Sequence, residues 1–173
     1  FSPDGLVGSL YNDFEPRDEQ VVMAKEVLKA FSTSTNLVVE AGTGVGKSMA
    51  YLLPSALGAL RSGSRIGVAT KTNALLDQIV YKELPLLKST LADAGVGDLS
   101  YVALKGFSHY PCMRKVSHIV SDGARTVNVT GKDVSQAPSI AALLSYIEQT
   151  EYDDMDGLKL DYRVLPRYAI TTT

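Results

Sequence analysis

Apolar and polar residues follow two different spacings along the first hundred positions. Apolar residues recur three or four positions apart over 17–31, which predicts one buried face of a helix. The same spacing covers 47–61 and 73–87. We expect Pro54 to bend the helix at 47–61 and Asn73 to cap the helix at 73–87. Short apolar runs predict buried strands at 37–40, 65–70 and 99–104.

Strands that alternate with helices every thirty residues or so are typical of βαβ units. The pattern therefore predicts an α/β fold with a parallel sheet. After residue 106 the alternation stops, and 107–138 carries scattered polar and small residues, with one helix expected around 112–120. A clearer helical pattern returns at 139–150. We place a domain boundary near residue 106, which divides the chain into 1–106 and a mostly helical 107–173.

Composition narrows the class of protein without identifying a partner. Hydrophobic residues make up 45% of the 173 positions and charged residues 21%, as in ordinary globular domains. The formal net charge of −2 indicates no overall basic field, although a local groove for nucleic acid remains compatible with it. No apolar run approaches the roughly 20 residues that span a bilayer, and we expect no membrane partner. The single cysteine excludes an internal disulfide and fits the reducing cytoplasm.

The sequence AGTGVGKS at 41–48 follows the first apolar run and leads into the second helical segment. It fits the Walker A pattern of P-loop proteins, with alanine in place of the first glycine. Glycines let the backbone turn tightly and direct its N–H groups at phosphate oxygens, while the helix dipole faces the same anion. We expect Lys47 to contact the β- and γ-phosphates of ATP and Ser48 to coordinate Mg²⁺. The candidate nucleotide-binding residues are Gly42, Thr43, Gly44, Val45, Gly46, Lys47 and Ser48.

An aromatic, an arginine and a glutamine stand three positions apart around the start of the first expected helix, as Phe14, Arg17 and Gln20. A glutamine amide can accept a hydrogen bond from adenine N6 and donate one to N7, a pattern that guanine does not offer. Phe14 is suited to pack on the base. These residues are therefore candidates for adenine recognition, although Arg17 and Gln20 are also compatible with an ordinary first helical turn.

The sequence VATKTNALLDQ places Thr70, Lys71 and Thr72 at the carboxyl end of the second expected strand. Ligands of open α/β sheets gather at that edge. Hydroxyl groups, a lysine and a helix N-terminus suit the phosphodiester oxygens of a nucleic acid. A polar turn with a helix cap explains the same residues without a ligand.

Taken in order, the aromatic-x-x-Arg-x-x-Gln pattern, VVEAGTGVGKS, VATKTNALLDQ and YVALKGFSHYPC resemble superfamily 2 DNA helicases of the DinG/XPD type. The resemblance runs from about residue 1 to 112, and its opening is similar to bacterial DinG-like and YoaA-like proteins. It implies an incomplete RecA-like P-loop NTPase domain, with a three-layer parallel sheet and the start of an inserted iron–sulfur domain. It also implies ATP-driven 5′-to-3′ translocation of a monomer on single-stranded DNA.

The resemblance assigns further roles. Thr70, Lys71, Thr72 and Gln78 correspond to a motif that grips the DNA backbone. Lys105 and Gly106 lead into the cluster domain, where Cys112 matches the first cysteine ligand of a [4Fe-4S] cluster. Such a cluster needs four thiolates, and the chain has one cysteine. We therefore expect the cluster only in a full-length protein, and this chain, which begins at Phe1, to be an N-terminal fragment.

The chain also lacks a recognisable Walker B box, which holds Mg²⁺ and helps to position the attacking water. Its one acidic cluster, Asp153, Asp154 and Asp156, follows no buried strand, and we interpret it as a solvated turn. We therefore expect the fragment to bind nucleotide at most, without steady hydrolysis.

Other functions remain open. The chain could be a nucleotide-gated module that binds DNA or protein without unwinding, or part of a DinG-like protein whose nuclease acts instead. A P-loop kinase of small molecules fits less well, because a kinase needs no backbone-gripping motif after the second strand.

Overall fold

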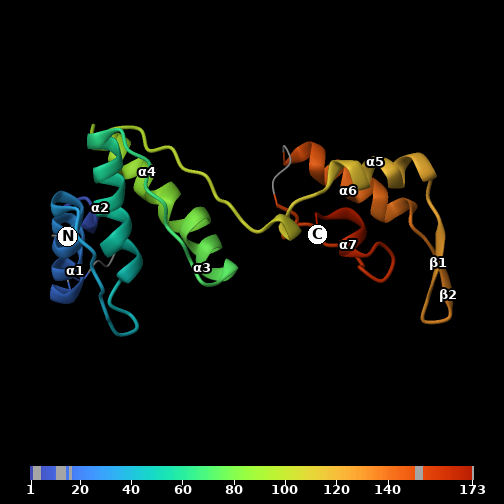
Figure 1. Cartoon of the computed structure of the whole chain (residues 1–173), viewed down its shortest axis with the longest axis horizontal. Coiled ribbons are helices and arrows are strands. Elements are labelled where there is room, and N and C mark those ends of the chain that lie inside the picture. Colours follow the sequence, from blue (N-terminus) through green and yellow to red (C-terminus); the bar gives the residue numbers. More distant parts are fainter. Residues whose placement is uncertain (2–4, 11–14, 16, 151–153, 173) are drawn as a thin grey trace. The chain divides into compact units, whose positions relative to one another are not determined.

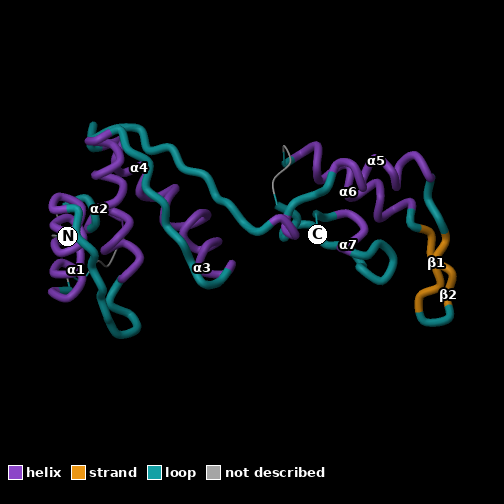
Figure 2. Tube along the Cα trace, viewed as in Figure 1, coloured by secondary structure: helices purple, strands orange, loops and turns teal. Residues whose placement is uncertain are grey.

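The computed structural model describes residues 1, 5–10, 15, 17–150 and 154–172. The expectation for Phe14 and that for Asp153 therefore lie outside the described residues. The chain divides into two compact units, Phe1–Ala103 and Leu104–Thr173. Figure 1 shows the elements of each unit, and Figure 2 colours the same trace by secondary structure.

The first unit is built from helices that confirm the periodic segments of the sequence. Its elements are a 3-10 turn at Gly8–Leu10, α1 (Asp18–Thr33), α2 (Lys47–Ser62), α3 (Asn73–Gln78), a π-helical turn at Ile79–Glu83 and α4 (Leu84–Asp93). Helix α2 continues through the buried Pro54. Both ends of α2 are set by glycines with positive φ, Gly46 (φ 75°) and Gly63 (φ 65°), where a side chain would be strained.

The segment from α3 to α4 differs from the single helix expected at 73–87. Thr72, rather than Asn73, is the N-cap, and its hydroxyl accepts a hydrogen bond from the Leu75 N–H at 3.3 Å. The π-helical turn lies just before Pro85, whose ring would clash with a carbonyl in a regular α-helix and which has no N–H to donate. A widened turn accommodates that proline.

The three expected strands of the first unit are not present: 37–40, 65–70 and 99–104 form no ladder and are loops in the structure. Val38 is 95% exposed and Val102 is 91% exposed, which is unusual for apolar residues in such runs. Parallel strands are stable when they pair with neighbouring strands and both faces of the sheet are covered. Within the described residues these segments have no such partners, and the three-layer parallel sheet is not confirmed.

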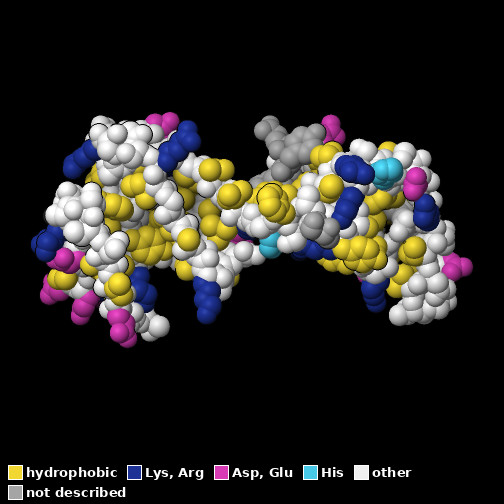
Figure 3. Space-filling view, viewed as in Figure 1, with side chains coloured by type: hydrophobic (Ala, Val, Ile, Leu, Met, Phe, Trp, Pro, Cys, Tyr) yellow, Lys and Arg dark blue, Asp and Glu magenta, His cyan; other side chains and the backbone are white. Residues whose placement is uncertain are grey.

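The core of the first unit lies between α2, the π-helical turn and α4. Helix α1 packs against α2, and apolar side chains from the start of the chain close the remaining space. Figure 3 shows that apolar side chains, in yellow, also reach the visible surface of this unit. The buried members are Val7, Leu10, Met49, Leu52, Leu53, Ala56, Ile79, Leu87, Leu91 and Leu99.

The second unit contains helices, and also a hairpin that the sequence analysis missed. Its elements are a 3-10 turn at Phe107–His109, α5 (Met113–Asp122), β1 (Thr126–Val129), β2 (Lys132–Ser135), α6 (Ala137–Gln149) and α7 (Arg167–Ile170). The strands β1 and β2 pair antiparallel around Thr130 (φ 51°) and Gly131 (φ 83°). Two residues of positive φ form the tight hairpin turn, and the glycine at its second position was the sequence signal for it.

A separate core holds the second unit together. Ile140, Leu143 and Ile147 form the buried face of α6, at the spacing that predicted this helix. They pack with Val116, Met155, Leu165 and Ile170. Among the helices that the structure describes, none combines the length and hydrophobicity that crossing a bilayer requires.

Candidate functional site

The Walker A segment forms an open turn in front of α2. Gly44 (φ 82°) and Gly46 (φ 75°) adopt the left-handed conformation, which only glycine enters without strain. Gly42, Thr43 and Gly44 are exposed, and a Cβ added at Gly42 or Gly44 would meet no atom within 4 Å. Helix α2 begins at Lys47, so its N-terminal N–H groups and dipole lie at the same turn. A glycine-containing turn that leads into a helix N-terminus is one feature that a phosphate site of a P-loop protein requires.

The Lys47 ammonium lies against the beginning of the same turn. Its Nζ donates to the carbonyl oxygen of Ala41 at 3.0 Å and also to that of Gly42. The lysine therefore bridges the two ends of the turn and concentrates positive charge there. An ammonium group has three hydrogens, and rotation about its flexible stem lets it exchange these carbonyls for phosphate oxygens.

Gln20 is the adenine candidate that the structure brings to the phosphate loop. The residue is 5% exposed, and its Nε2 donates to the carbonyl oxygen of Gly46 at 3.0 Å. Arg17, in contrast, is exposed and is the N-cap of α1. Of the predicted adenine-binding residues, Gln20 thus contacts the phosphate loop through its amide, a contact that the sequence did not reveal.

Ser48, the predicted Mg²⁺ ligand, lies half-buried in the first turn of α2. Tyr51, one turn further on, also contacts the first core. Burial raises the pKa of the Tyr51 hydroxyl, against the opposing effect of a hydrogen bond with Ser48, and the nearby Glu83 carboxylate raises it further. Mg²⁺ commonly takes one or two protein ligands and completes its shell with phosphates and water, so a single hydroxyl beside an open phosphate loop fits that ion.

The candidate DNA-binding residues lie at the start of α3 and along its length. Thr70 Oγ1 donates to the carbonyl oxygen of Thr72 at 3.1 Å, and Thr72 caps the helix. Lys71 between them is exposed. Gln78, at the far end of α3, donates from Nε2 to Glu83 Oε1 at 2.9 Å. The structure therefore groups Thr70, Lys71 and Thr72 in one turn and places Gln78 at the opposite end of the same short helix.

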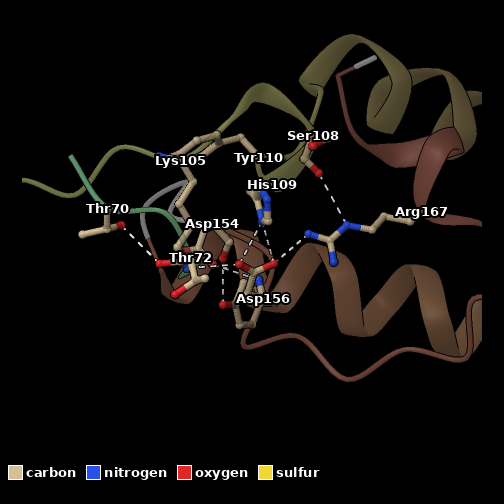
Figure 4. Close-up of polar contacts among 10 residues, drawn as sticks. Thr70, Thr72, Lys105, Ser108, His109, Tyr110, Asp154, Asp156 and Arg167 are labelled. Carbon is tan, nitrogen blue, oxygen red and sulfur yellow. Dashed lines mark hydrogen bonds and ion pairs between the residues drawn. The ribbon is translucent and has the colours of Figure 1, made fainter. Parts of the chain in front are cut away.

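The second unit contains an ion cluster that the sequence analysis did not predict. The side chain of Lys105 is 2% exposed, and its Nζ lies 3.0 Å from a carboxylate oxygen of both Asp154 and Asp156. His109 Nδ1 lies 2.9 Å from Asp156 Oδ2, and an Arg167 terminal nitrogen lies 2.7 Å from Asp156 Oδ1. Figure 4 shows these side chains gathered around Asp156, with Arg167 also reaching the carbonyl of Ser108.

This cluster corrects the interpretation of the acidic residues as a solvated turn. The Asp154 side chain is 7% exposed, and Tyr146 donates its hydroxyl hydrogen to the Asp154 carbonyl at 2.9 Å. Partial burial alone would raise the pKa of Asp156. Hydrogen bonds from Arg167, His109 and Lys105 outweigh that effect and hold this pKa well below its ordinary value. Asp156 lies 51 positions from Lys105 in sequence, and Asp154 two positions closer, so local patterning could not reveal these pairs.

Cys112, the predicted cluster ligand, lies half-buried at the N-cap of α5. Its N–H donates to the Ile170 carbonyl at 2.8 Å, and Pro111 forms an isolated bridge with Thr171. The described residues contain no group of three or more His, Cys, Asp and Glu side chains arranged to hold a metal. One thiolate does not fit a four-thiolate cluster, so the residues of this chain cannot hold that group by themselves.

Comparison with known proteins gives consistent matches. The chain is 38% identical over 116 residues to the ATP-dependent DNA helicase YoaA of Escherichia coli, an alignment of 67% of this chain and 17% of that protein. It is 35% identical over 156 residues to the ATP-dependent helicase DinG of Mycobacterium tuberculosis, covering 83% of this chain and 23% of that protein. The 3′-5′ exonuclease DinG of Bacillus subtilis is 33% identical over 154 residues, with 89% of this chain and 15% of that protein covered. No protein-family model matches the chain.

The phosphate loop and these matches together define a P-loop NTPase-like protein. More narrowly, the chain belongs to the DinG/YoaA-like family, as its motifs predict. The chain spans between 15% and 23% of the length of these three relatives.

Proposed function

We propose that the chain is the nucleotide-binding part of an ATP-dependent DNA helicase that translocates 5′-to-3′ on single-stranded DNA. The observation that carries this proposal is the geometry of 41–48. An exposed turn with two left-handed glycines leads into α2, and Lys47 lies across its mouth. ATP is the nucleotide because Gln20, the residue suited to adenine, lies against this turn. Ser48 provides the protein ligand for Mg²⁺, which neutralises phosphate charge when bound.

The finer fold is part of the proposal. The apolar loops at 37–40, 65–70 and 99–104, which are largely exposed apart from the buried Leu99, have the composition of buried parallel strands. A cavity of about 640 Å³ in the first unit is lined by residues of the last two of these loops together with α2, including Ile66, Val68 and Tyr101. We propose that a longer protein fills this space with further strands and completes a three-layer, RecA-like domain.

The DNA contact is assigned to the turn before α3. Lys71 is exposed between two threonines, and a cation beside two hydroxyl groups suits a phosphodiester backbone better than a base edge. Gln78 adds a second polar group at the end of α3. In the full-length protein, Lys71→Ala should weaken single-strand binding equally for all sequences and reduce its salt dependence by about one counterion, whereas Lys25→Ala on exposed α1 should not. An unchanged salt slope contradicts the assignment.

The second unit is proposed as the start of the inserted iron–sulfur domain. Cys112 would supply one thiolate, and the other three would come from residues beyond this chain. We propose that the protein acts as a monomer in the cytoplasm, where reduced thiols, ATP and DNA are all present.

A second candidate function is favoured by the match to a protein named as an exonuclease. In that case the P-loop part would bind nucleotide and DNA while a nuclease module acts on the strand. Nuclease activity of the longer protein that survives Lys47→Ala would support this candidate over unwinding.

The test of the proposed nucleotide site is a titration of the chain with ATP and Mg²⁺. We expect measurable binding and at least tenfold weaker binding for Lys47→Ala, because the lysine provides the main charge at the mouth of the turn. Lys82→Ala, at an exposed lysine of the π-helical turn, is the matched control. Equal affinity of Lys47→Ala and the unchanged chain would refute the site, and steady ATP turnover would refute the expectation that this chain does not hydrolyse ATP.

A further inference from the structure

One buried amide connects the first helix to the phosphate loop. Gln20 lies in the first turn of α1, and its Nε2 donates to the carbonyl oxygen of Gly46, 26 positions away, at 3.0 Å. The same carbonyl accepts the Ala50 N–H at 3.2 Å, the first hydrogen bond of α2. Both lone pairs of the Gly46 oxygen are therefore occupied, one by the helix and one by Gln20.

The partner fixes the orientation of the amide. A carbonyl oxygen accepts hydrogen bonds and cannot donate them, so the nitrogen of the Gln20 amide, and not its oxygen, must face Gly46. That nitrogen carries two hydrogens, and the amide oxygen is a separate acceptor. The contact with Gly46 thus uses one of the hydrogens that Gln20 can donate.

Sterics tie the two residues together as closely as the hydrogen bond does. A Cβ added at Gly46 would lie 2.2 Å from Gln20 Nε2 and 3.0 Å from its Cδ. Gly46 also has φ 75°, which a residue with a side chain rarely adopts. Gln20 therefore occupies the space in which a side chain at position 46 would lie, next to the last peptide of the loop before Lys47.

We propose that Gln20 is a positioning residue for the polyphosphate tail, because its amide holds Gly46 and so orients the end of the phosphate loop. This inference rests on the proposed nucleotide site and adds to it a role that does not depend on the base. Adenine, when bound, would engage the second hydrogen and the oxygen of the same amide. One side chain would then couple base recognition to the shape of the loop.

A ligand without a base separates this role from adenine recognition. Inorganic tripolyphosphate and ATP, each with Mg²⁺, are titrated into the full chain and into Gln20→Met, which keeps the length of the side chain but removes its donor. We expect both ligands to bind about three- to tenfold more weakly, as for the loss of one hydrogen bond. Glu19→Gln, at the exposed neighbouring position, is the control and should bind both ligands unchanged.

The outcomes distinguish the inference from the proposed function. Weaker ATP binding with unchanged tripolyphosphate binding would show that Gln20 acts only in recognition of the base. That result would overturn the inference but leave the proposed nucleotide site in place. If the unchanged chain binds neither ligand, the proposed site fails, and hydrogen exchange then tests the loop directly. We expect the amides of 42–47 to exchange faster in Gln20→Met than in Glu19→Gln, and equal exchange would overturn the inference.

A pair of substitutions tests the steric part. Gly46→Ala should be less damaging to tripolyphosphate binding in a Gln20→Ala background than in the unchanged chain, because the clash with the amide is gone and only the φ strain remains. An equal loss of tripolyphosphate affinity in both backgrounds would show that the Gln20 side chain does not restrict the space at Gly46.

Discussion

Each unit of the molecule has its own apolar core, but buried ionic contacts between distant segments are added in the second unit. In Phe1–Ala103, helices pack through the apolar faces that their sequence spacing provides, and the apolar loops between them stay exposed. In Leu104–Thr173, polar contacts join segments far apart in sequence, such as the ion pair of Lys105 with Asp154 and the hydrogen bond from Cys112 to Ile170. The first unit thus exposes apolar loops to solvent. In the second unit, polar contacts connect residues near its first positions with residues near its last positions.

The difference indicates which substitutions should affect each unit. A buried charge in the second unit depends strongly on its partner, because removing one leaves the other uncompensated. A unit with exposed apolar loops should tolerate changes in those loops until other strands pair with them. The predictions below test this contrast.

The largest effect is expected from Lys105→Met. The Asp154 carboxylate, 7% exposed, would lose the buried ammonium 3.0 Å away. Breaking a buried ion pair on one side commonly costs about 3–5 kcal/mol of unfolding free energy, so the second unit should lose stability on that scale. Hydrogen exchange resolved along the chain would locate the loss in the second unit, with the first unit unchanged.

Two further variants make this prediction sharper. Lys159→Met, at an exposed lysine of the same unit, should be nearly neutral. Lys105→Met combined with Asp154→Leu should recover part of the lost stability, since it leaves no unpaired charge. A loss below about 1 kcal/mol for Lys105→Met alone would mean that the cluster does not hold the unit together.

The next effect concerns acid stability. The folded pKa of Asp156 lies below its ordinary value of 3.8, so the native state favours the ionised form. The resulting stabilisation is present above pH 3.8 and is lost as the pH falls from there toward the folded pKa. We expect the second unit to unfold in this range before the first, and Asp156→Asn to weaken the dependence on pH.

Acid unfolding measured at high salt distinguishes the contribution of Asp156 from that of an exposed ion pair. Arg163 holds the pKa of Asp161 at about 2 through hydrogen bonds, but that pair is exposed. Salt screens exposed charges far more than clustered, partly buried ones. An acid transition that disappears in 1 M salt, or that Asp156→Asn leaves unchanged, would assign it to surface charges instead.

The sequence predicts the elements that form within one segment better than the contacts that join distant segments. Spacing predicts α1, α2 and α6 because a helix forms its hydrogen bonds within its own segment. It predicts strands at 37–40 and 65–70 that do not form, because a strand needs partners that the segment itself does not contain. The Walker A residues adopt the expected turn because glycine chemistry is local. The Gln20 contact and the Lys105 cluster were missed because each joins residues that only the folded chain brings together.

The smallest change in stability should come from the exposed apolar loops. Val38→Thr with Val102→Thr replaces two side chains that are 95% and 91% exposed. Exposed substitutions usually change the unfolding free energy by less than about 0.5 kcal/mol, so the chain should remain equally stable. Self-association and the binding of a hydrophobic dye should decrease, because contiguous apolar surface drives both. A loss of more than about 1 kcal/mol would instead show that these residues are already packed within this chain, and that its first unit needs no further strands to cover them.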